Sequence, residues 1–143
     1  MFSAASNSFD EAKPILTEGD ERLCRVCTPV DAIDDGLRAE IAALFRTLAW
    51  FRRRHGFGRA IAAPQTGVLH RAIAIDLGAG PFVLINPKIT WRSEEMFELW
   101  DDCFSVPDRL VRVRRHKSVS VTYRDAQFRP RQYSRILPAI LRP

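Results

Sequence analysis

Two short segments of the chain contain the residue types that hydrolytic and metal chemistry uses. The first is Gly58-Arg59-Ala60-Ile61-Ala62-Ala63-Pro64-Gln65. Its small residues allow a backbone to pass close to a ligand, and Pro64 fixes the approach to Gln65. A glutamine held in this way can donate its amide N–H to a carbonyl oxygen. The simpler interpretation is a tight loop that carries a surface glutamine.

The second segment runs from Trp100 to Pro107 and places a single cysteine, Cys103, between acidic and aromatic neighbours. A thiolate is a good soft metal ligand and a good nucleophile. The alternative is a buried cysteine that acts as a small apolar residue. Neither segment alone decides between these interpretations.

The other two cysteines, Cys24 and Cys27, form a C-x-x-C pair. A structural zinc site usually needs four ligands, and no second pair follows this one. Because Val26 and Val30 flank the pair in a β-like stretch, we predict two partly buried cysteines without a redox or metal role. An odd number of cysteines also argues against a disulfide framework.

Taken together, the two segments resemble the first two signature motifs of the peptide deformylase family, G-φ-G-φ-A-A-P-Q and E-G-C-φ-S. The resemblance extends from about Ile15 to Asp125. It implies an α+β fold with antiparallel and mixed sheets packed around helices. It also implies a metallohydrolase that removes the formyl group from the N-terminal methionine of nascent polypeptides, with iron(II) or zinc as the metal. The implied partners are formylated nascent peptides and, through them, the ribosome.

The resemblance assigns roles residue by residue. Cys103 matches the cysteine ligand of the metal, and Gln65 matches the glutamine that bonds the formyl oxygen as it gains charge. The backbone N–H of Phe104 matches the second donor to that oxygen. The substrate-binding positions are Gly58, Ala60 and Ile61. The chain departs from the pattern where Ala60 replaces the second glycine, where Arg59 takes an aliphatic place, and where Asp101-Asp102 replaces Glu-Gly.

The third family motif, H-E-x-x-H on a helix, is missing from these 143 residues. The three histidines are His55, His70 and His116, and no two of them are four residues apart. The family's catalytic helix would begin near Ile140, so we expect an incomplete domain that does not retain the metal and is weakly active or inactive, because three protein ligands are usual for a catalytic zinc. One alternative is that His116, His70 or a second chain completes the site.

A second alternative is a non-catalytic module that binds nascent-chain termini or ribosomal RNA. A run of basic residues would serve it: Arg109, Arg112, Arg114, Arg115 and Lys117. Such a run binds phosphates in some proteins and is the solvated face of a strand in more of them.

The elements follow from periodicity. Apolar residues at helical spacing predict a helix that starts after Asp31 or Asp34 and runs to about Arg53, where Gly56 and Gly58 end it. Short strands are predicted from alternation at 72–76, 82–86, 87–92 and 96–100, with one more within 127–134. Alternation at 110–113 and 119–123 predicts that these two segments form a half-buried antiparallel pair.

Composition is that of one globular domain. The chain is 46% hydrophobic and 27% charged, with a net charge of +5. We expect residues 1–14 to be a loose segment, residues 15–143 to form one domain, and residues 136–141 to approach a further element. No apolar stretch is long enough to span a membrane and no secretory signal is evident, so we expect a cytoplasmic protein.

Overall fold

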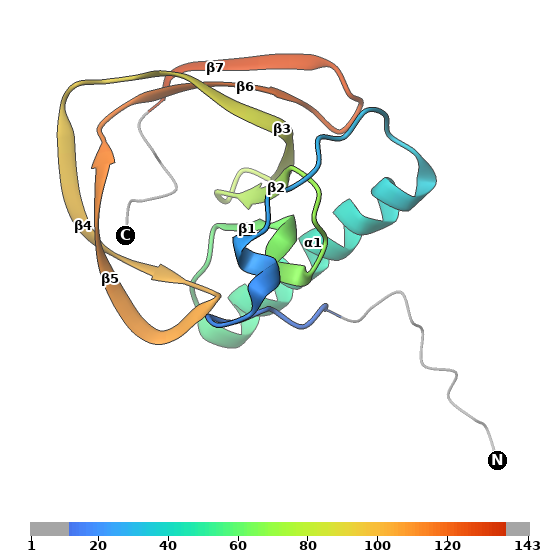
Figure 1. Ribbon diagram of the computed structural model, residues 1–143, viewed down its shortest axis with the longest axis horizontal. Helices are drawn as coiled ribbons and strands as arrows, with labels where there is room; N and C mark the ends of the chain where they lie inside the picture. The colour runs from blue at the N-terminus through green and yellow to red at the C-terminus, as the bar shows by residue number, and fades with distance from the viewer. Residues whose placement is uncertain (1–11, 137–143) are drawn as a thin grey trace.

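The computed structural model describes residues 12–136, so the expectations for residues 1–11 and 137–143 lie outside the described part. The fold is α+β, as predicted, and Figure 1 shows its arrangement. The helical elements are η1 (Glu21–Cys24), α1 (Asp35–His55) and η2 (Ala63–Thr66). The strands are β1 (Ala60–Ala62), β2 (Ala72–Asp76), β3 (Pro81–Arg92), β4 (Met96–Cys103), β5 (Val106–His116), β6 (Val119–Arg124) and β7 (Pro130–Ile136).

Helix α1 forms where its apolar spacing predicts it. Asp34 is the N-cap, and its side chain accepts a hydrogen bond of 2.8 Å from the N–H of Leu37, one of the donors that a helix start leaves free. The helix runs two residues beyond the predicted Arg53. Gly56 then ends it with φ +78°, a left-handed conformation that glycine adopts without steric cost.

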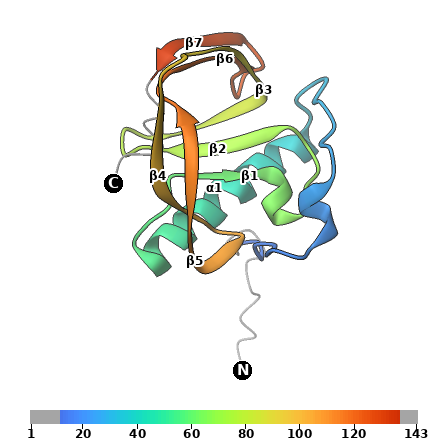
Figure 2. The ribbon, with the colours of Figure 1, turned by 60° about the vertical axis from the view of Figure 1, so that its left-hand side comes forward.

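The strands form two antiparallel sheets. One sheet has five strands in the order β1-β2-β3-β6-β7, and the other is the β4-β5 ribbon. Helix α1 lies across β1 and β2, as Figure 2 shows. Ala72 and Ala74 of β2 lie in this contact and are buried. Their small side chains allow the helix to approach the sheet closely. The core between these layers contains Leu48, Ile61 and Ile85, each at most 1% exposed.

The predicted break at Pro87 was wrong. Residues 81–92 form one long strand, and the chain passes Pro87 by a bulge rather than a turn. Ile85 pairs with Arg124 and Lys88 with Thr122, so β3 has one residue more than β6 in this interval. Proline cannot donate a ladder hydrogen bond, and the bulge removes the need for one.

The predicted pairing of 110–113 with 119–123 was also wrong. Strand β5 pairs with β4, whereas β6 pairs with β3 and β7. Alternation indicates which side chains share a face but not which strand is the partner. Leu110 and Val111 are 62% and 47% exposed, so this part of β5 is not half-buried either.

The environment of the C-x-x-C pair differs in part from the prediction. Cys24 ends the 3₁₀ helix η1 and is exposed, so it is neither in an extended stretch nor partly buried. Cys27 is partly buried, as predicted. Both are free thiols.

Candidate functional site

The fold brings the two chemistry-bearing segments together. The first continues from β1 into η2, which presents Gln65, and the second ends β4 at Cys103. Gln65 Nε2 lies 3.9 Å from Cys103 Sγ and donates a 3.1 Å hydrogen bond to Ser105 Oγ. The residues that the sequence separates by about forty positions therefore share one small site.

The orientation of the Gln65 amide is fixed by its own segment. Its Oε1 accepts a 2.9 Å hydrogen bond from the N–H of Ala62, which leaves Nε2 as the end directed at Ser105 and Cys103. Pro64 stands within the first turn of η2 and Gly67 closes it with φ +81°. A tight turn with glycine in the left-handed region is thus what holds the glutamine.

Cys103, Phe104 and Ser105 sit at the tip of the β4-β5 ribbon. Cys103 pairs with Val106, so Phe104 and Ser105 make a two-residue turn between the strands. Both turn residues are buried, at 8% and 6% exposed, whereas Cys103 is exposed. The ribbon therefore presents the thiol to solvent beside the donor group of Gln65.

The first glycine of the site segment contacts this turn. Gly58 has φ +111°, and a Cβ built on it would lie 2.3 Å from Cζ of Phe104. The Phe104 ring also stacks on Phe51 of α1, with ring centroids 3.6 Å apart. Gly58 and Phe51 together hold the ring, and with it the backbone of Phe104.

A segment near the start of the described chain joins the two halves of the site, and sequence reasoning missed it. The N–H of Leu16 donates to the carbonyl of Gln65, and the N–H of Glu18 donates to the carbonyl of Ser105, each at 2.7 Å. Backbone hydrogen bonds depend on no residue type, so no sequence signal could have revealed this link. Ser105 was missed as well, although it follows the predicted Cys103-Phe104 pair directly.

The remaining substrate-binding positions differ in their surroundings. Ala60 is partly exposed in β1, whereas Ile61 is 1% exposed and its side chain packs in the core. Any contact of Ile61 with a ligand would therefore use its backbone.

The described residues do not make up a metal site. Within 12–136 no group of three His, Cys, Asp or Glu side chains has the arrangement to hold an ion. His70 Nδ1 lies 2.8 Å from Glu40 Oε2, and His116 Nδ1 lies 2.7 Å from the Ser93 carbonyl. His116 pairs with Met96 at the end of the β4-β5 ribbon opposite the turn beside Cys103, so it does not contribute to this site.

None of the helices in residues 12–136 combines the length and the apolar character needed to cross a bilayer.

Comparison with known proteins gives a consistent result. The family model described as polypeptide deformylase matches residues 12–139. A peptide deformylase of Treponema pallidum is 37% identical over 107 residues, which are 75% of this chain and 63% of the relative. A peptide deformylase-like protein of Bradyrhizobium diazoefficiens is 36% identical over 115 residues, 79% of this chain and 65% of the relative. The chain thus spans less than two thirds of the length of these two relatives.

Solved structures show the same fold. A peptide deformylase from Legionella pneumophila superposes with a TM-score of 0.79 at 31% identity, over 90% of this chain and 75% of that one. A peptide deformylase from Synechococcus elongatus in complex with actinonin gives 0.79 at 34% identity, over 91% and 71%. The chain therefore belongs to the polypeptide deformylase family.

Proposed function

We propose that this chain is a peptide deformylase-like protein that recognises the formylated N-terminus of nascent peptides and, on its own, hydrolyses the formyl group weakly or not at all. The observation that carries the proposal is the 3.9 Å approach of Gln65 Nε2 to Cys103 Sγ. It sets an amide donor beside a solvent-exposed thiol, which suits binding of a small carbonyl group. The setting for this function is the cytoplasm, where nascent chains emerge.

Gln65 and the backbone N–H of Phe104 would be the two donors to the formyl oxygen. A carbonyl oxygen gains negative charge when it is attacked, and preorganised donors stabilise that charge. Gln65 is preorganised by its bond to Ala62 and Phe104 by the contacts of its ring with Gly58 and Phe51.

The peptide itself would lie along β1. This strand is at the edge of the five-stranded sheet, so among residues 12–136 no strand pairs with its other side. The N–H of Asp76 donates to the carbonyl of Arg59, and the alternation of antiparallel pairing then turns the backbone groups of Ala60 toward the open side. An extended peptide can pair with such an edge.

We expect hydrolysis by this chain to be weak or absent because its metal site is incomplete. Members of the family usually use a metal ion, which supplies a water of lowered pKa when bound. Cys103 is the one residue of this site that would serve as a ligand, and a catalytic ion usually needs three. Two further ligands would have to come from outside residues 12–136, since no metal-binding group is found there and His70 and His116 are engaged elsewhere.

The test compares binding and turnover in the purified chain. We expect formyl-Met-Ala-Ser to bind more tightly than Met-Ala-Ser, and Gln65→Ala to remove that preference. The matched control is Gln132→Ala, which removes an exposed amide on β7. With added iron(II) or nickel(II), turnover should stay far below the roughly 1–10³ s⁻¹ of working enzymes.

Two results would contradict the proposal. Equal affinity for the two peptides would show that the chain does not recognise the formyl group. Tightly bound stoichiometric metal together with normal turnover would show that the chain is an active hydrolase.

The alternative role in RNA binding through β5 gains little support from the charges around it. Ion pairs join Arg109 to Glu18, Arg112 to Glu98, Arg115 to Asp101 and Lys117 to Glu95. Four of the five cations of the run thus have a carboxylate partner, which reduces the charge that this strand offers to phosphates.

A further inference from the structure

From Ile41 onward α1 carries four arginines, of which only Arg52 forms an ion pair within residues 12–136. Residues Ile41–His55 contain Arg46, Arg52, Arg53 and Arg54 and no Asp or Glu. Arg52 pairs with Asp76 at 2.6 Å, but within residues 12–136 no ion pair is formed by Arg46, Arg53 or Arg54. The partial negative charge at a helix C-terminus favours cations in the last turn, but it does not account for Arg46, two turns earlier.

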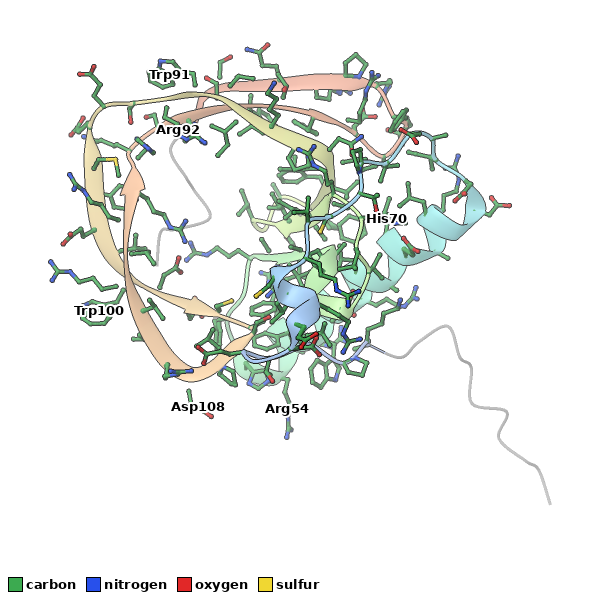
Figure 3. The ribbon with its side chains drawn as sticks, in the orientation of Figure 1. Arg54, His70, Trp91, Arg92, Trp100 and Asp108 are labelled. Atoms are coloured by element: carbon green, nitrogen blue, oxygen red, sulfur yellow. The ribbon has the colours of Figure 1, made fainter. Side chains whose placement is uncertain are left out.

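An exposed tryptophan lies among these arginines. Arg46, Trp50, Arg53 and Arg54 are spaced i, i+4, i+7 and i+8, so they share one face of the helix. Trp50 is 43% exposed although the apolar face of α1 is buried in the core. Figure 3 shows Arg54 projecting away from the ribbon at this end of α1.

A pocket opens beside the tryptophan. It has a volume of about 540 Å³ and is lined by Trp50, Phe51 and His55 of α1 and by residues 12–15, including Lys13. Aromatic walls and a nearby cation are the features that accept a nucleobase and the phosphate attached to it.

We propose that Lys13, Arg46, Trp50, Arg53 and Arg54, here called the α1 patch, bind single-stranded nucleic acid. The arginines contact phosphates, and a base stacks on Trp50 at the mouth of the pocket. An acidic peptide would pair with the arginines but would offer no base to stack on Trp50. A membrane surface would need an exposed apolar face, whereas the apolar face of α1 is buried. This proposal does not depend on formyl-peptide recognition, which uses residues of β1, η2 and the β4-β5 turn.

The test measures the anisotropy of a fluorescein-labelled oligouridine RNA mixed with the 143-residue chain, from about 50 to 200 mM salt. Arg53→Gln with Arg54→Gln should weaken binding about tenfold at low salt. It should also reduce the slope of log K against log salt by about 1.4, since each phosphate contact on a single strand contributes about 0.7. The matched control, Arg92→Gln with Arg114→Gln, removes two exposed arginines elsewhere and should change little.

Stacking is tested separately. Trp50→Ala should weaken binding about tenfold with an unchanged salt slope, while Trp50→Phe retains most of the affinity. Trp100→Ala, which removes a 65% exposed tryptophan on β4, is the control and should have no effect. Circular dichroism of each variant checks that the helix is intact.

Several outcomes would overturn the proposal. One is equal loss of affinity in the two double-arginine variants, and another is full RNA binding by Trp50→Ala. Equal or tighter binding of an oligoglutamate peptide or of phosphatidylserine vesicles would show that the patch attracts other partners. Absence of RNA binding at low salt would also overturn it.

Discussion

At the scale of single residues, the contact between Gly58 and Phe104 links the two segments of the site. Gly58 combines a left-handed backbone with a space that the Phe104 ring already fills. The sequence pattern places a glycine here, and the structure supplies two physical reasons for it. Either a changed φ or a displaced ring would move the turn that presents Cys103.

Gly58→Ala is therefore expected to destabilise the fold by about 2–4 kcal/mol, of which about 1–2 reflects the left-handed backbone and the rest the clash with Phe104. Urea denaturation measures this. Gly78→Ala is the matched control, because Gly78 also has a positive φ, +96°, but no atom within 4 Å of the added Cβ. Gly78→Ala should lose only the stability that the left-handed backbone accounts for. An equal loss of stability in the two variants would show that the contact with the Phe104 ring contributes nothing.

At the scale of elements, α1 supports the site from behind, since Phe51 holds the Phe104 ring. The start of the helix depends on the cap at Asp34. Asp34→Ala should reduce the free energy of unfolding by about 1 kcal/mol, because it leaves an N–H of the first turn without its partner. Asp31→Ala, an exposed aspartate three residues earlier, should change it by less than about 0.5 kcal/mol. If the two variants behave alike, the cap is not a source of stability.

The bulge in β3 is held by a side chain as well as by the sheet. Asn86, at φ +51°, accepts a 2.8 Å hydrogen bond from the N–H of Val30 and donates one of 2.7 Å to its carbonyl. Asparagine tolerates the left-handed region better than most residues. The two bonds tie the segment before α1 to the sheet.

Asn86→Ala should destabilise the protein by about 2–3 kcal/mol, because it removes two hydrogen bonds of about 1 kcal/mol each and leaves both groups of Val30 without that partner. Asn86→Asp is the informative companion, since it keeps the acceptor for the N–H of Val30 and loses the donor to its carbonyl. The midpoint of thermal unfolding should be higher for the wild type than for either Asn86→Asp or Asn86→Ala. A wild-type midpoint in Asn86→Ala would contradict this role of the side chain.

At the scale of the whole molecule, the sequence predicts what is local or carried by a motif. Helix α1 is predicted because its apolar period and cap lie within one continuous segment. The motifs single out Gln65 and Cys103 as candidate site residues, and their roles stay predictions. The partner of β5 is not predicted, since alternation defines a face and not a neighbour. The pairing of Arg109 with Glu18, 91 residues away, is equally invisible because it depends on how the β4-β5 ribbon folds back.

The stability of the whole molecule at acid pH should depend on Asp125 in the turn between β6 and β7. Burial alone would raise the pKa of Asp125, but hydrogen bonds from the N–H groups of Arg129 and Gln127 and from the Arg131 and Arg129 side chains outweigh it. The pKa of Asp125 falls from 3.8 to about 2.

A carboxylate with a lowered folded-state pKa stabilises the protein above its unfolded value, and that contribution is lost as pH falls through the folded value. Asp125 therefore contributes stability above about pH 4 that disappears by about pH 2. Chemical denaturation as a function of pH should show Asp125→Asn less stable than the wild type near neutral pH, with the difference shrinking to nothing near pH 2. A difference that stays constant from neutral to acid pH would mean that the ionised carboxylate does not stabilise the turn, and that the substitution acts through packing instead.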